Sequence, residues 1–127
     1  MKGVVKSLLA SFKKPSLTQE QFFAYFHKLP DGISVDWKRD GKFIIGKVQA
    51  GDFEFMTQGK TAEQFVDMVN DAVLTVFDIP RDYVDILREV KSYNPPEDAW
   101  RSLCDQSVKK SYIAIKKDTK QPSLRLA

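Results

Sequence analysis

The sequence predicts an α+β fold in which a three-stranded antiparallel meander is covered by a helix, with further helices added at both ends. Residues 33–38 alternate apolar and polar side chains, the pattern of a strand with one buried face. Asp40-Gly41 follows, a strong hairpin signal, because glycine adopts a positive φ without strain. Residues 62–77 carry a broad apolar stripe at helical spacing, which is typical of a helix lying on a sheet.

Two more strands complete the predicted meander, at residues 43–49 and 53–56, with a turn at 50–52 between them. Because the connections are tight, the three strands must be antiparallel neighbours. Residues 57–61 are expected to turn sharply into the helix, with Gly59 at a positive φ. Thr61 and Gln64 have the spacing of a capping box, so Thr61 is predicted to cap the helix and to be a structural residue.

The first 30 residues are predicted to form a helical extension. A basic segment with apolar residues at helical spacing ends at Pro15, and Thr18 with Gln21 predicts a capped helix from there to about Leu29. Phe22 and Phe26 share one face of this helix with Tyr25 and Leu29, whereas Phe23 and His27 lie on another. Two apolar faces on one short helix predict that one of them contacts a partner.

The segment after residue 79 predicts two helices, at 81–93 and at 96–110, separated by Asn94-Pro95-Pro96. Residues 112–115 are expected to form a last strand on an open sheet edge, and 118–127 a flexible tail. The predicted organisation is therefore a helical extension at 1–30, a core at 31–79, C-terminal helices with the edge strand at 80–117, and the tail.

Composition argues against most classes of enzyme. The chain has 127 residues, one cysteine, Cys104, and one histidine, His27, which excludes an internal disulfide and leaves little for metal or triad chemistry. The acidic side chains of Asp36, Glu54, Asp67 and Asp71 are expected to be solvated rather than to converge on metal ions. No apolar run is long enough for a transmembrane helix. We expect a cytoplasmic, non-enzymatic protein without a cofactor or a metal.

The charge distribution is uneven, with an acidic body between two basic ends. Residues 1–14 hold four lysines and no acid, and residues 106–127 are also strongly basic. Basic ends attract phosphates, anionic lipids or an acidic partner, and the alternative is that these lysines only keep the ends soluble. The candidate contacts to an anion or a partner are Lys109, Lys110, Lys116 and Lys117.

Residues 33–77 resemble the HicB-like antitoxin superfamily. The matching residues are Gly41, the aromatic Phe43, the stretch 57–61, and Glu63 and Ala72 in the helix. The family has a Pro-Gly turn where this chain has Ala50-Gly51-Asp52, and an alanine where it has Phe65. The resemblance implies a trimmed ribonuclease-H-like fold and a protein-binding antitoxin of a toxin–antitoxin system, which acts by occluding a partner such as a toxin ribonuclease.

Two other functions remain open on sequence grounds. The basic ends favour a binder of nucleic acid or of an anionic surface, and a homo-oligomeric structural protein of a mobile element is the third hypothesis. The surplus of apolar residues predicts a homo-oligomer, most simply a dimer, because monomers rarely expose a large apolar patch. Its interface is expected at the N-terminal helices or at an exposed edge of the meander; the candidate residues in those helices are Leu8, Phe12, Phe22, Phe23 and Phe26.

Overall fold

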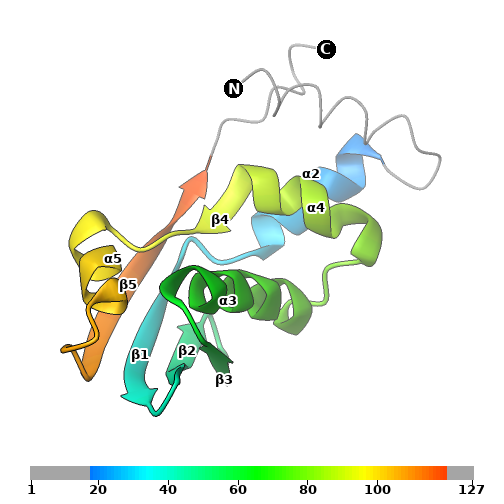
Figure 1. Cartoon of the computed structure of the whole chain (residues 1–127). Coiled ribbons are helices and arrows are strands. Elements are labelled where there is room, and N and C mark those ends of the chain that lie inside the picture. Colours follow the sequence, from blue (N-terminus) through cyan, green and yellow to red (C-terminus); the bar gives the residue numbers. More distant parts are fainter. Residues whose placement is uncertain (1–17, 120–127) are drawn as a thin grey trace.

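A computed structural model describes residues 18–119 of the chain (Figure 1). The elements are α2 (Gln19–Lys28), β1 (Gly32–Asp40), β2 (Phe43–Ala50), β3 (Phe53–Gly59), α3 (Ala62–Val76), α4 (Arg81–Val90), β4 (Lys91–Tyr93), α5 (Glu97–Cys104) and β5 (Lys110–Thr119). The strands form one antiparallel sheet in the order β3-β2-β1-β5-β4. The predicted α+β class and the three-stranded meander are confirmed.

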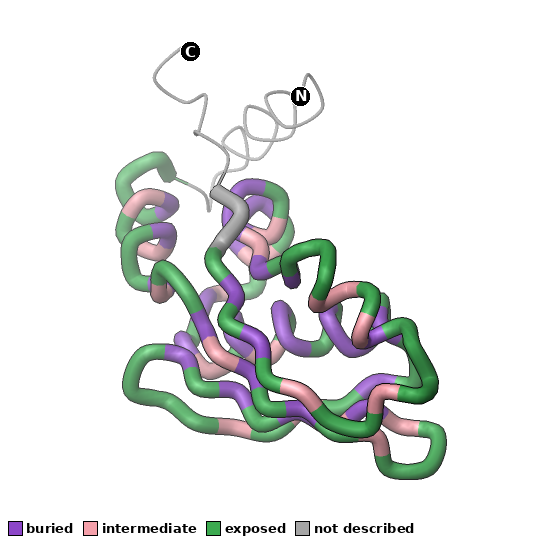
Figure 2. The backbone as a smooth tube through the Cα atoms, turned by 90° about the vertical axis from the view of Figure 1, so that its left-hand side faces the viewer, coloured by how far each residue is buried: buried purple, intermediate pink, exposed green. Residues whose placement is uncertain are grey.

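The described part has two layers, with α2, α3 and α4 on one face of the sheet (Figure 2). Along β1, Ile33, Val35 and Trp37 are buried beneath the helices, and the residues between them point to the other face. The same alternation in β2 buries Ile44 and Val48. Among the described residues no element covers the opposite face, which we call the open face (Figure 2).

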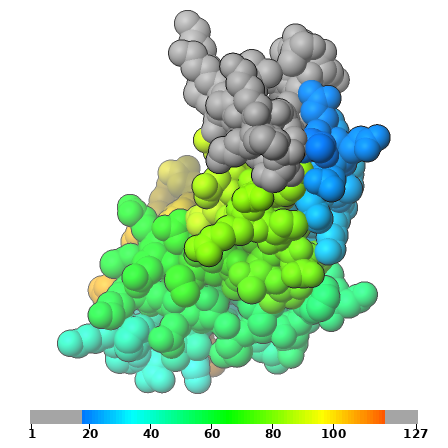
Figure 3. Space-filling model, turned by 90° about the vertical axis from the view of Figure 1, so that its right-hand side faces the viewer, coloured from blue at the N-terminus to red at the C-terminus, as the bar shows by residue number. Residues whose placement is uncertain are grey.

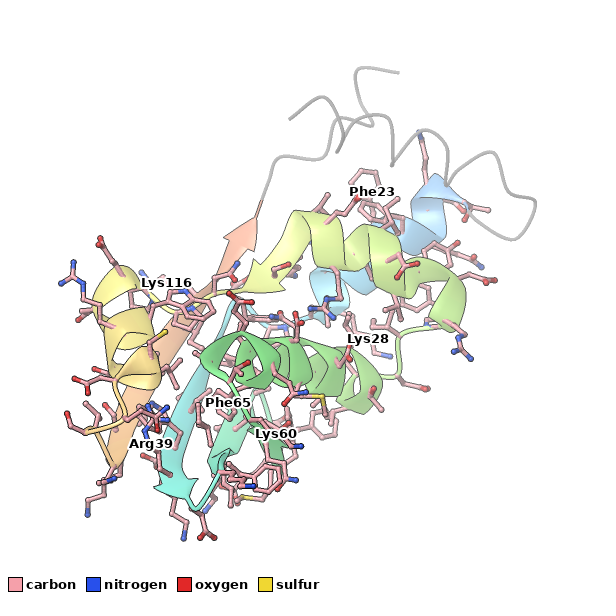
Figure 4. The ribbon with its side chains drawn as sticks, in the orientation of Figure 1. Phe23, Lys28, Arg39, Lys60, Phe65 and Lys116 are labelled. Atoms are coloured by element: carbon pink, nitrogen blue, oxygen red, sulfur yellow. The ribbon has the colours of Figure 1, made fainter. Side chains whose placement is uncertain are left out.

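Helix α3 packs closely on β2 and β3 because two glycines lie beneath Phe65. The Phe65 side chain points from α3 toward the sheet (Figure 4) and is 1% exposed. A Cβ on Gly46 would lie 2.4 Å from Phe65 Cζ, and a Cβ on Gly59 would lie 2.5 Å from the Phe65 backbone nitrogen. Any larger residue at either position would therefore push the helix away from the sheet.

The first-hairpin glycine, Gly41, has the expected positive φ, whereas the prediction of a positive φ for Gly59 is wrong. Gly41 has a φ of +61° in the first hairpin. Gly59, by contrast, lies inside β3 opposite Ile44, and positive φ among the described glycines occurs at Gly41 and Gly51. β3 therefore runs on to Gly59 instead of ending at Met56, and glycine is needed there for the close approach of α3.

The helix caps follow the predicted pattern. Thr61 accepts a hydrogen bond from the Gln64 backbone N–H at 3.0 Å, and Gln64 Oε1 accepts one from the Lys60 N–H at 2.6 Å. Thr18 caps α2 in the same way, accepting from the Gln21 N–H at 3.1 Å. The bonds to Thr61 and Thr18 satisfy the Gln64 and Gln21 amides, which have no carbonyl partner within their helices, and the Gln64 side chain binds the amide of Lys60 just before α3.

The C-terminal half departs from the prediction in three places. Residues 91–93 form β4 instead of extending the helix, and α5 ends at Cys104 rather than near residue 110. β5 lies between β1 and β4, and it includes Asp118 and Thr119, which were assigned to the tail. Because β5 pairs with β1 along most of its length, the C-terminal segment completes the same sheet as the meander.

A buried asparagine explains why the chain leaves the helical conformation at residue 91. Asn70 Nδ2 donates to the Tyr93 carbonyl at 3.0 Å, and Asn70 Oδ1 accepts from the Tyr93 N–H at 2.8 Å. The amide thus pairs with Tyr93 as a neighbouring strand would. Asn70 itself is 5% exposed.

Arg39 fixes α5 to the end of β1. Its guanidinium donates to the carbonyls of Leu103, Asp105 and Val108 at 2.5–2.8 Å (Figure 4). These carbonyls lie at and beyond the end of α5, where carbonyls have no helical partner and a cation is favoured.

Candidate functional site

The free edge of β3 borders an apolar groove. Among the described residues β3 pairs only with β2, so its other side is an unpaired sheet edge next to α3. Figure 3 shows the side of the molecule on which β3 and α3, in green, lie below α4. The groove between them has a volume of about 370 Å³ and is lined by Phe55, Met56, Thr57, Met68, Asp71, Ala72, Thr75 and Val76.

Large apolar side chains are exposed along this groove. Met56 is 61% exposed and Met68 is 41% exposed, and Phe53 at the start of β3 is 47% exposed. Edge strands are usually protected by lysine, by proline or by a cover. β3 contains neither lysine nor proline, and its one charged residue is Glu54. This edge is therefore open to pairing with another strand.

The open face of the sheet carries the second candidate surface. A hollow of about 520 Å³ lies over β3, β2, β1 and β5. Ile45 and Met56 contribute apolar surface to it, and Lys38, Lys47 and Lys110 contribute charge together with Asp36. Tyr112, which pairs with Asp36 across β1 and β5, is 61% exposed on the same face.

Two lysines lie directly opposite each other on this face. In the register of β1 and β5, Lys38 pairs with Lys110. Like charges in this position destabilise a sheet. Among the described residues the ion pair on the open face joins Lys47 to Glu54 at 3.5 Å, and neither Lys38 nor Lys110 takes part in it.

The two layers differ in charge. Residues 62–105, which contain α3, α4 and α5, include ten acidic and four basic residues, and one of the latter, Lys91, is buried. On the open face four lysines outnumber three acids: the lysines are Lys38, Lys47, Lys110 and Lys116, and the acids are Asp36, Asp40 and Glu54. The described part therefore has an acidic helical layer and a basic sheet face.

The structure separates the candidate lysines of the C-terminal segment. Lys110 and Lys116 project from the open face of β5, and Lys109 is exposed in the turn before it. The side chain of Lys117 lies outside the described residues.

Sequence reasoning did not single out Lys38, Lys47 or Tyr112. The alternation in each strand predicts the face of each side chain, but only the pairing of β1 with β5 shows that they adjoin.

The candidate interface residues of the N-terminal helix lie mostly inside the chain. Phe22 and Phe26 are buried in the core, and Phe23 is half-buried against it. The Nζ of Lys91 donates to the carbonyls of Phe26 and Leu29, which ties the end of α2 to β4. Phe22 and Phe26 are thus not accessible to a second copy, and Leu8 and Phe12 lie outside the described residues.

The acidic residues do not converge. Asp36 and Glu54 lie on the open face, whereas Asp67 and Asp71 lie on α3 and pair with Arg88 at 2.8 and 2.9 Å. Among the side chains that the structure describes, no three of His, Cys, Asp or Glu could together hold a metal ion. His27 is exposed, with its ring against the edge of Phe26.

A scan of family models, a search of curated proteins and a search of solved structures each return no match to the chain. None of the helices in the described part is long and apolar enough to span a membrane. The candidate sites therefore rest on the chemistry of the two surfaces, the β3 groove and the open face.

Proposed function

We propose that the protein is a non-catalytic protein-binding module that takes up an extended segment of a partner along β3. The observation that carries this proposal is the unpaired edge of β3 beside a groove with exposed methionines. A peptide that extends a sheet gains backbone hydrogen bonds, and pockets for its alternate side chains give specificity. Here the pocket is the groove between β3 and α3.

The finer form of the proposal is a HicB-like antitoxin that occludes the active surface of a toxin ribonuclease. It is supported by the sequence resemblance, which spans residues 33–77 and thus the two elements that form the groove. The acidic helical layer next to the groove is complementary to the basic surface of an RNA-binding partner. In this arrangement β3 supplies the backbone contacts and the helical layer supplies the charge.

The experiment is a selection of binding peptides from a displayed random library, followed by calorimetric titration of the selected peptides. We expect peptides with alternating apolar residues, because every second side chain would enter the groove. Met68→Lys should weaken their binding at least tenfold, since it places a charge in the groove at an exposed position. Ala24→Lys, on the exposed side of α2, is the matched control and should bind as the wild type does.

Two results would overturn the proposal. The first is that no peptide is selected, or that the selected peptides bind Met68→Lys as tightly as the wild type. The second is a light-scattering mass of twice 14.5 kDa that falls to the monomer value in Met68→Lys. That mass would assign the β3 edge to a second copy of the chain and support the homo-oligomer predicted from the sequence.

A further inference from the structure

We propose that the open face binds single-stranded nucleic acid, with phosphate held by Lys38 and Lys110 and a base stacked on Tyr112. This site goes beyond the proposed function and does not depend on it, because it uses the face of the sheet rather than its edge. The two surfaces share only Met56.

The lysine pair is the first argument. Lys38 and Lys110 are directly opposite each other, and both line the hollow of about 520 Å³. Their repulsion is a cost to the folded chain. A phosphate between them would relieve it, so the face is better suited to an anionic ligand than to solvent alone. Lys47 in the same hollow and Lys116 further along β5 extend the positive charge across the sheet.

The exposed aromatic ring is the second argument, and it distinguishes nucleic acid from other anions. Tyr112 is two residues from Lys110 on β5 and therefore projects from the same face. Proteins that bind single strands combine a positive surface with aromatic rings on which bases stack. Ile45 and Met56 supply further apolar surface for a second base. Asp36, between Lys47 and Tyr112 in the sheet register, is placed to accept a hydrogen bond from a base amino group.

The charge of the two layers is the third argument. The helical layer is acidic and repels a polyanion, whereas the open face is basic and attracts it. Nucleic acid is therefore directed to the one face that no described element covers. This placement differs from the one expected from the sequence, in which the basic ends of the chain make the contacts.

The test is fluorescence anisotropy with labelled 12-nucleotide oligo(U) and oligo(dT), measured from 50 to 300 mM KCl with the full chain. Lys38→Gln with Lys110→Gln should weaken binding at least tenfold and reduce the salt dependence, since each lost phosphate contact lowers the slope by about 0.7. Tyr112→Ala should weaken binding about tenfold and leave the slope unchanged. Lys28→Gln, an exposed lysine of α2, is the matched control and should have no effect (Figure 4).

The lysine variants also have a readout that does not require a ligand. Because Lys38 and Lys110 repel each other, Lys38→Gln should raise the melting temperature by a few degrees, which would show that weaker binding is not caused by unfolding. The proposal is overturned if the wild type binds neither oligonucleotide at 10 µM protein in about 50 mM salt. It is equally overturned if binding survives in the lysine and tyrosine variants but is lost when residues 1–14 and 120–127 are removed, because the contacts would then belong to the ends of the chain.

Discussion

Gly46→Ala is the substitution that tests the packing of α3 on the sheet most directly. A Cβ at this position would lie 2.4 Å from Cζ and 2.8 Å from Cε1 of Phe65, and 3.1 Å from a Val35 methyl group. Phe65 is 1% exposed, so its ring can move only against the residues packed around it. Overpacking of this kind costs about 1–3 kcal/mol, and we expect Gly46→Ala to lower the free energy of unfolding by about 2 kcal/mol.

Phe65→Leu should suppress this cost, because leucine lacks the two ring atoms that the new Cβ would meet. The single substitution Phe65→Leu is expected to cost about 2 kcal/mol for the lost burial. In that background Gly46→Ala should cost less than about 0.5 kcal/mol, which gives a coupling energy of about 1.5–2 kcal/mol. Gly59→Ala is the matched control: its Cβ would meet the backbone nitrogen and Cα of residue 65 at 2.5 and 2.6 Å, so Phe65→Leu should not relieve it.

The assay is urea unfolding, followed by the fluorescence of the buried Trp37 and by far-ultraviolet circular dichroism. The four free energies of the Gly46 and Phe65 cycle give the coupling directly. If Gly46→Ala costs the same in both backgrounds, the Phe65 ring does not lie over Gly46. Relief of Gly59→Ala by Phe65→Leu would also contradict this reasoning, since the backbone of α3 would then not be the group that excludes a side chain there.

Three further predictions concern the cap, the buried amide and the buried phenol. Thr61→Ala should lower the free energy of unfolding by roughly 1 kcal/mol in urea titrations, because the Gln64 N–H loses its acceptor, and an unchanged midpoint would contradict the cap. Asn70→Leu should cost about 2–4 kcal/mol in the same assay, because it leaves the buried N–H and C=O of Tyr93 without their partner, and hydrogen exchange at Tyr93 should accelerate. Burial raises the pKa of Tyr93, so the protonated phenol stabilises the fold fully below its unfolded pKa of about 10 and progressively less as the pH rises above that value. The free energy of unfolding of the wild type should therefore fall by up to about 1.4 kcal/mol per pH unit above pH 10. Tyr93→Phe should remove this component of the pH dependence. Equal slopes of the free energy of unfolding against pH in the two proteins would contradict the role of Tyr93.

The first hairpin, the meander and α3 could be predicted because each depends on neighbours in the sequence. Alternation over six residues assigns the faces of β1, and Asp40-Gly41 closes a hairpin with little choice of register. Thr61 caps α3 by accepting a hydrogen bond from the amide three residues later. The open face follows in part from the same alternation, whereas Lys110 and Lys116 are candidate contacts in the sequence only because the C-terminal segment is basic.

Two of the errors, at residues 91–93 and at the N-terminal helix, involve contacts between distant segments, and the third involves the packing of α3 on β3. Residues 91–93 have a helical pattern, but Asn70 pairs with Tyr93 and holds them as a strand. Gly59 looks like a turn glycine, but glycine is required there because a Cβ would collide with the backbone of α3 at Phe65. Phe22 and Phe26 look like a surplus apolar face until they are buried in the core by the rest of the chain.

The sequence by itself therefore determined the meander, its covering helix, the helix caps and the uneven charge of the chain, because short-range sterics and hydrogen bonds decide these features. Tertiary structure alone decided that β5 lies beside β1, and with it the juxtaposition of Lys38 and Lys110 and the position of Tyr112 on the open face. It also decided that β3 ends the sheet beside a groove. The physical reason is that strand order and register follow from which apolar faces can be buried together across the whole chain, and no local pattern encodes that choice.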